Sequence, residues 1–512
     1  MTTTTLGETL GKGRGIALGS LTIFALSFIA VAASAATGSG TKLVAPAVIL
    51  VVVSTVWYRQ LLEWRALLAL MVLVVLLIPV DRYTLPASLP FELEPYRVLA
   101  ALLFLAWFTS LLIDPRVRPR KSGLDRPIAA YVMVVIASLL VNPTRVHSVS
   151  SIVTKKLTFF GSFFLLFFVL VSCCRRFEDI ERLVRVLVIG SCVVAFFAIV
   201  ESRTGFNIFD HIPLLRRGVL PLTIGDFSAI SRGGRLRAYA SAEHPIALGA
   251  VLALVTPLAV AIAASSRRRI WWAAPVLLLL GAIASVSRTA MLMDVIIVLV
   301  FLWLRPRQVR RFWPLLLPGV VVIHLALPGT IGGLASSFFP SGGLVAQQTN
   351  AAVGSGRLAT LGPALDKEFL PDPLFGEGFA TRVSGPTDGT LPNAPILDDQ
   401  WAGVLCETGV LGFASLLWIF FGFIRRTGRA AKEDPGPRGW LLAGFAASAG
   451  SFLVGMATFD AFSFIQVTIM FFICLGLGCA LLRVGLDAVR PEAPRRDIAW
   501  RPPSLQDTPA PS

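Results

Sequence analysis

Long apolar segments follow one another along nearly the whole of this chain, and they constrain its fold more than any other feature. A segment of about 20 apolar residues can cross a bilayer as a helix, because a helix satisfies its own backbone hydrogen bonds in hydrocarbon. Only 15% of the residues are charged and the mean hydropathy is +0.75, whereas soluble domains have about 25% charged residues. We therefore expect an all-α polytopic membrane protein.

Hydropathy predicts about fourteen transmembrane helices, with ends placed to within a few residues. They lie at 16–36, 43–57, 64–80, 97–113, 127–142, 157–172, 183–200, 245–264, 270–286, 288–304, 313–328, 401–424, 438–459 and 462–482. The segment 16–36 has an alternative reading as a signal peptide, which the predicted topology disfavours. The spans divide the chain into an N-terminal bundle (1–200), a first large loop (201–244), central spans (245–328), a second large loop (329–400), C-terminal spans (401–482) and a disordered tail (483–512).

Lysine and arginine predict the orientation, because cytoplasmic loops carry an excess of these residues. With a cytoplasmic N-terminus, the inside segments hold 30 of the 46 Lys and Arg residues and the outside segments hold the other 16. Both large loops then lie outside, and the C-terminus is cytoplasmic. The net charge of +16 comes from clusters between the spans, so it does not indicate a nucleic-acid partner.

Metal and nucleotide chemistry have no support in the sequence. The six cysteines include no pair with the spacing of metal ligands, and the four histidines are well separated. No phosphate-binding loop of the Gly-x-x-x-x-Gly-Lys type is present.

Arginines on the predicted outer side are the candidate binding residues, because translocation disfavours cations near spans. They include Arg237 in the first loop, Arg288 at the start of a span and Arg357 in the second loop. A guanidinium binds phosphate through two parallel hydrogen bonds, so several together would suit a diphosphate carried on a lipid. Alternatively, each arginine reaches lipid headgroups or pairs with an acid of its own loop.

Three acidic residues surround the point where the second loop returns to the membrane. Asp398 and Asp399 precede the span, and Glu407 lies about two turns inside it at 1.5 Å per residue. A carboxylate there could accept a proton from a substrate hydroxyl or bind a cation. Alternatively, Asp398 and Asp399 cap the helix. A buried Glu407 needs a partner, and we expect one of the outside arginines.

Three motifs carry a family resemblance. The first reads RAYASAEHPIALG (237–249), with His244 before the proline that begins a span, and the second reads SRTA (287–290). The third combines PLFGEG (373–378) with ETGVLG (407–412). In this order and spacing they resemble the O-antigen ligase and polymerase superfamily, the Wzy-type integral membrane glycosyltransferases. The resemblance covers roughly residues 200 to 424, and the N-terminal half fits in architecture only.

The resemblance implies a GT-C-like enzyme of a bacterial cytoplasmic membrane. Such an enzyme transfers or polymerises glycans from a polyprenyl-diphosphate donor on the extracytoplasmic face, for O-antigen, exopolysaccharide or capsule assembly. The resemblance also implies that Arg237 and Arg357 bind the donor diphosphate, with Arg288 and His244 in supporting roles. The ligases carry His-Asn where this chain has Asp398 and Asp399. This departure favours a polymerase or another surface-glycan transferase over transfer to lipid A.

In the implied reaction, Asp398 accepts the proton of the acceptor hydroxyl while Asp399 and Glu407 have supporting roles. No metal and no cofactor are needed, because arginines supply the positive charge and the activated lipid supplies the energy. The implied partners are the donor, a glycan or lipid acceptor, the bilayer, a flippase and a chain-length regulator. Two alternatives stay open. A lipid-linked glycan transporter should place its charges near mid-membrane, and a scaffold would not need a long structured loop.

Overall fold

The structure is a computed structural model that describes residues 64–80, 82–83, 94–113, 119–211, 231–232, 235–310, 314, 321, 357–382 and 397–489. In these residues it is helical, apart from a two-residue antiparallel ladder between β1 (Ser231–Arg232) and β2 (Arg235–Leu236). The helices of eight or more residues are α3 (Trp64–Leu77), α4 (Pro95–Ile113), α5 (Asp125–Val141), α7 (Ser150–Cys173), α8 (Phe177–Thr204), α10 (Pro245–Ser265), α11 (Ala273–Ala284), α12 (Arg288–Leu304), α17 (Arg357–Ala364), α18 (Gln400–Glu433), α19 (Pro437–Gly455) and α20 (Ile465–Val489).

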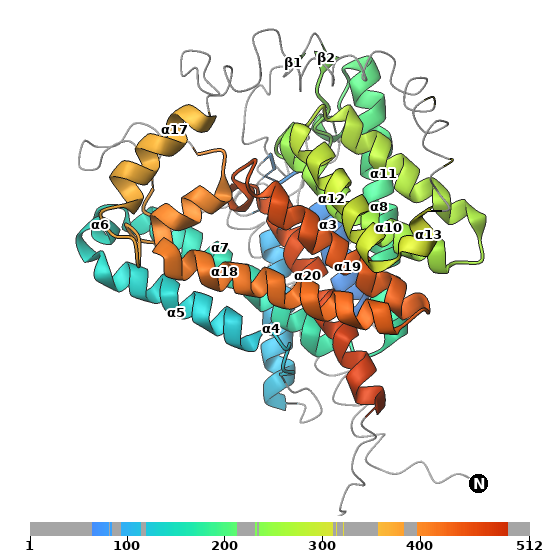
Figure 1. The fold of residues 1–512 in the computed structure, drawn as a ribbon, viewed down its shortest axis with the longest axis horizontal. Coiled ribbons are helices and arrows are strands. Elements are labelled where there is room, and N and C mark those ends of the chain that lie inside the picture. The colour runs from blue at the N-terminus through green and yellow to red at the C-terminus, as the bar shows by residue number, and fades with distance from the viewer. Residues whose placement is uncertain are drawn as a thin grey trace, which may run out of the picture.

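Short helices connect several of these. They are α6 (Pro143–Ser148), α13 (Pro306–Arg310), the 3-10 turns η1 (Ile208–Asp210), η2 (Arg269–Trp272) and η6 (Ala461–Ser463), and the π-helical turn η5 (Leu365–Phe369). Figure 1 shows α5, α6 and α17 on one side of the molecule and α8, α10, α11 and α12 on the other, with α18, α19 and α20 between them.

The expectation of an all-α membrane protein is confirmed. Among the described residues, five helices are long and apolar enough to cross a bilayer, namely α7, α8, α10, α18 and α20. The total of fourteen spans stays a prediction, because the segments 16–36 and 43–57 and nearly all of 313–328 lie outside the described residues. The predicted start of a disordered tail at residue 483 is wrong, since α20 continues to Val489. A helix can continue beyond the bilayer wherever helix-forming residues follow.

Small residues bring the central helices together. Helix α10 is apolar on all sides and almost fully buried, as expected of a helix in the middle of a bundle. A methyl group at Gly444 of α19 would lie 2.9 Å from the carbonyl oxygen of Pro257 in α10. At Gly281 of α11 it would lie 2.6 Å from the Cβ of Ala195 in α8. Such close backbone contacts replace the hydrophobic effect as the force that joins helices in lipid.

Chain direction brings five helix ends together at one end of this bundle. Helices α5 and α19 end there, and α7, α18 and α20 begin there. The predicted orientation places this end outside the cell. It is also the end at which the second large loop returns to the membrane through Asp399 and α18.

Candidate functional site

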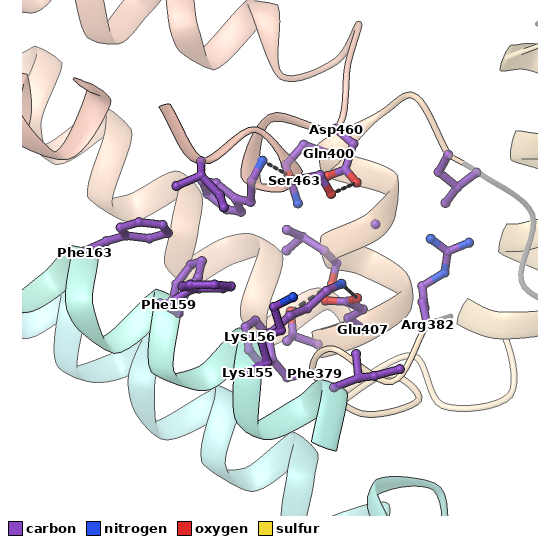
Figure 2. A pocket seen from close by; sticks show the side chains of 18 of the residues that line it. Lys155, Lys156, Phe159, Phe163, Phe379, Arg382, Gln400, Glu407, Asp460 and Ser463 are labelled. Carbon is purple, nitrogen blue, oxygen red and sulfur yellow. Dashed lines mark hydrogen bonds and ion pairs between the residues drawn. The ribbon is translucent and has the colours of Figure 1, made fainter. Parts of the chain in front are cut away.

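A cavity of about 420 Å³ opens among these five helix ends. Its charged lining consists of three cations and three carboxylates: Lys155, Lys156, Arg382, Asp399, Glu407 and Asp460. Figure 2 shows the lysines on one helix facing Glu407, with Arg382 beside them and Asp460 across the cavity. A concave site with a few convergent polar groups is the usual form of a binding or active site.

Lys156 and Glu407 form the ion pair of the cavity, with Nζ 3.7 Å from Oε1. The Glu407 side chain is 16% exposed and that of Lys156 is 44% exposed. The predicted partner of Glu407 was an outside arginine, and the observed partner is a lysine near the start of α7. This lysine reaches Glu407 because α7 begins at Ser150, before the predicted start at residue 157.

A kink in α18 positions Glu407. Gly409 has φ 63° and ψ −167°, so the helix is interrupted two residues after Glu407. The segment 373–378 supplies the missing backbone partners, since the Glu377 N–H donates to the Cys406 carbonyl and the Val410 N–H donates to the Pro373 carbonyl, both at 2.8 Å. The PLFGEG and ETGVLG motifs of the sequence are therefore bonded to each other directly.

Two glycines allow this contact. Gly376 also has a positive φ of 67°, and a methyl group on it would lie 2.5 Å from the Cys406 carbonyl oxygen. A methyl group on Gly409 would lie 2.3 Å from the Leu374 carbonyl oxygen. Other residues rarely adopt a positive φ, and here they would also meet backbone atoms.

Buried ion pairs hold the loop around the cavity. Arg382 binds the carboxylate of Glu368 in η5 through both Nε and Nη2. Burial opposes the charge of Arg382, but Glu368 outweighs this effect and raises the guanidinium pKa. Arg145 of α6 lies 2.6 Å from Glu377. Burial nevertheless raises the pKa of Glu377 above its ordinary value. The Arg145 pair fixes the second loop against α6, and the Arg382 pair joins two parts of that loop.

Aromatic rings form the apolar part of the cavity lining. The ring centroid of Phe160 lies 5.3 Å from that of Phe462 and 5.4 Å from that of Phe379. All three line the cavity together with Phe159 and Phe163. The cavity thus offers both charged and aromatic side chains, which suits an amphiphilic ligand with an anionic group.

Asp460 lies across the cavity from Lys155 and Lys156 (Figure 2). It lies between α19 and η6 and accepts a hydrogen bond from the Ser463 hydroxyl. Burial raises the pKa of Asp460, although that hydrogen bond and the nearby Lys156 oppose the shift. The neighbouring backbone is fixed by Gln400, whose side-chain oxygen accepts from the Phe462 N–H at 2.6 Å.

The two adjacent aspartates predicted from the sequence differ in their position relative to the cavity. The capping alternative is confirmed for Asp399, whose Oδ1 accepts from the N–H groups of Trp401 (2.9 Å) and Ala402 (3.2 Å). Asp399 also lines the cavity. Its neighbour Asp398 is half-buried and is not among the lining residues.

Arg237 packs against the segment that leads to Arg288. Neither arginine lines the cavity. Arg237 is 4% exposed and its Nε donates to the Ser285 carbonyl at 3.1 Å. The Ala238 N–H donates to the Ala284 carbonyl at 3.2 Å. The structure therefore brings the RAYASAEHPIALG motif against the segment that precedes Arg288.

His244 has a structural role at the start of α10, where its Nδ1 accepts from the Ile246 N–H at 3.1 Å. The adjacent Glu243 accepts from the N–H groups of Ile465 and Gln466 at the start of α20. These bonds connect the first motif to the helix ends around the cavity. Helix α17 begins at Arg357, whose side chain lies outside the described residues.

Four charged residues that line the cavity were not predicted from the sequence: Lys155, Lys156, Arg382 and Asp460. The adjacent lysines carried a usable signal, because two cations directly before a span are disfavoured on the outer side. The sequence signal for Asp460 was weaker: it is an acid in a very short connection between two spans. In the part of the chain that the structure describes, no three His, Cys, Asp or Glu residues are grouped to hold a metal ion.

Comparison with known proteins found no protein-family model that matches this chain and no curated protein that matches it.

Proposed function

We propose that this chain is a membrane glycosyltransferase of the O-antigen ligase and polymerase type. It transfers or polymerises glycans from a polyprenyl-diphosphate donor on the extracytoplasmic face, in the assembly of a surface polysaccharide. The observation that carries the proposal is the cavity in which Lys156, Arg382 and Glu407 face aromatic side chains at the membrane end of the second large loop. The family resemblance of the motifs supports the same function, and the third motif contributes Glu407 to the cavity.

The charged lining suggests a division of roles. Lys155, Lys156 and Arg382 bind the donor diphosphate and stabilise the charge that develops on it, which does not require a metal. Glu407 orients Lys156. Aromatic rings such as Phe160 and Phe462 hold sugar rings or the first isoprene unit.

The reaction is a single displacement. The oxygen of the acceptor hydroxyl attacks the anomeric carbon of the donor glycan, and the bond from that carbon to the diphosphate oxygen breaks with its electron pair on the diphosphate. Asp460 accepts the hydroxyl proton, in place of the predicted base Asp398, because Asp460 lines the cavity. The configuration at the anomeric carbon inverts.

Chain length of the surface polysaccharide tests this proposal in cells. The variants Lys156→Gln and Arg382→Gln should each lose long chains at equal protein level, because each removes a diphosphate ligand. Lys367→Gln is the matched control, since Lys367 is exposed in the same loop and the change in charge is the same. Wild-type chain length in both cavity variants would refute the proposal.

A lipid-linked glycan transporter is the second candidate, and the kink in α18 favours it. Transporters build their binding sites on interrupted helices, and the interruption at Gly409 adjoins the cavity. A transporter would move the donor across the membrane without consuming it. Release of polyprenyl diphosphate in the absence of an ion gradient therefore separates the two functions.

A further inference from the structure

A group of exposed cations lies at the end of the bundle opposite the cavity, where α5 begins and α18 ends. We call this group the basic cluster, and its members are Lys121, Arg126, Arg425, Arg426 and Arg429. The charge pattern predicts that this end faces the cytoplasm. A general excess of positive charge is expected there, so the cluster needs a feature beyond its charge to be a binding site.

That feature is a bonded framework between distant parts of the chain. Arg426 donates from Nη1 to the Gly123 carbonyl, and Arg483 of α20 donates from Nε to the Lys121 carbonyl at 2.6 Å. Gly123 has φ +87°, and a methyl group on it would lie 2.6 Å from Nη1 of Arg426. The glycine therefore allows the guanidinium to bind the loop. Three segments are fixed together so that their remaining cations share one surface.

Nearby acids neutralise this surface only in part. The Asp125 carboxylate accepts from the N–H groups of Ser122 and Gly123 at 3.0 and 3.1 Å and from the Ser122 hydroxyl. These hydrogen bonds are consistent with the lowered pKa of Asp125, which burial opposes. Asp434 pairs with Arg438 at 3.4 Å. Glu433 is exposed at the end of α18, and Asp125 keeps its negative charge because its pKa is lowered. The five cations of the cluster outnumber these two acids.

Apolar side chains continue from the cluster toward the cavity end. Trp418 and Phe421 of α18 are each more than half exposed and lie seven and four residues before Arg425, on the same helix face. On α5, the exposed Met133 lies seven residues after Arg126. Helices α5 and α18 pack side by side (Figure 1). Each helix thus presents an apolar, lipid-facing stripe that ends in a cation.

We propose that the basic cluster binds the headgroup of an anionic phospholipid, with the phosphate at Arg425 and Arg429 and an acyl chain along Trp418 and Phe421. Guanidinium groups bind phosphate oxygens through paired hydrogen bonds, and basic pockets between transmembrane helices recognise such headgroups. The neighbouring lipid-facing stripes select a membrane lipid over a free anion. This inference does not depend on the proposed function.

Native mass spectrometry of the full-length chain tests the proposal. The protein is released from micelles that contain phosphatidylglycerol and phosphatidylcholine, and retained lipid is counted. We expect retained phosphatidylglycerol, with affinity weakened about tenfold or more in the double variant Arg425→Gln, Arg429→Gln. The variant Arg425→Lys, Arg429→Lys keeps the charges and should retain most of the binding, which also controls for folding.

The matched control is Arg267→Gln, Arg268→Gln, which removes two exposed arginines from the connection between α10 and α11 at the same end of the bundle. This control should leave phosphatidylglycerol binding unchanged. Equal weakening by both glutamine pairs would mean that only the general positive field acts, and would overturn the proposal. Retention of phosphatidylcholine as strongly as phosphatidylglycerol, or equal competition by inorganic phosphate, would overturn it as well.

Discussion

At the scale of single residues, two aspartates compete for the role of base. Asp398 has the position that the family resemblance assigns, whereas Asp460 lines the cavity and has a raised pKa. A base is more effective when its pKa lies nearer the working pH. Asp399 is less suited, because one of its oxygens accepts two backbone N–H groups of α18. Its place in the cavity lining favours Asp460, and its raised pKa suits it to accept a proton.

The variant Asp460→Asn should lower the transfer rate by about a hundredfold or more, because the amide cannot accept the hydroxyl proton. The rise of activity with pH on the acid side should also disappear. The measurement is the rate of glycan transfer as a function of pH for Asp460→Asn and Asp398→Asn. A larger loss in Asp398→Asn would support the assignment made from the sequence instead.

Asp460 also predicts how stability depends on pH. Its raised pKa means that the folded state binds the proton more tightly than the unfolded state. This contribution is complete below the unfolded pKa of about 4 and is lost as pH rises through the higher folded pKa. The melting temperature of Asp460→Asn relative to wild type should therefore increase between acidic and neutral pH. A difference that stays constant or decreases over this range would contradict the assigned shift.

At the scale of elements, the kink in α18 and the segment 373–378 form one unit. The sequence contained both motifs, and a family resemblance related them. It could not show that they bond to each other, because the contact depends on backbone conformation at Gly376 and Gly409. Hydropathy also predicted an uninterrupted span there, since a single glycine hardly changes the mean hydropathy of a helix.

Replacement of Gly409 or Gly376 by alanine should destabilise the protein by about 2 kcal/mol or more, because each residue has a positive φ and faces a backbone carbonyl. The measurement is thermal unfolding of the purified protein. The control is Gly161→Ala in α7, where the added methyl group meets nothing within 4 Å. Alanine favours the helix by up to about 1 kcal/mol at that position. Equal stability of the three variants would contradict the role of the kink.

At the scale of the whole molecule, the bundle has a cavity end and a basic end. Hydropathy predicted the described helices well, because lipid requires continuous apolar segments. The site was harder to predict, because lysines in the first turns of α7, an arginine of the second loop and an aspartate between α19 and α20 converge only when the helices pack. Arg237 was one of two arginines predicted to bind the diphosphate, and its guanidinium contacts the Ser285 carbonyl outside the cavity lining.

This polarity predicts the labelling of single cysteines in intact cells. A cysteine at Ser148, exposed at the cavity end, should react with a membrane-impermeant maleimide. A cysteine at Arg268, exposed at the opposite end, should react only after the cells are opened. The parental chain gives the background from its six native cysteines. Labelling in the reverse order would invert the topology and remove the cavity from the extracytoplasmic face.

Reconstitution with a lipid-linked donor tests the central claim most directly. The purified chain is placed in vesicles with a polyprenyl-diphosphate oligosaccharide and no ion gradient, and both glycan length and free polyprenyl diphosphate are measured. We expect longer glycans together with stoichiometric release of polyprenyl diphosphate, and loss of both products in Arg382→Gln. Donor that remains intact, or merely changes leaflet, in the presence of folded wild-type protein would contradict this claim.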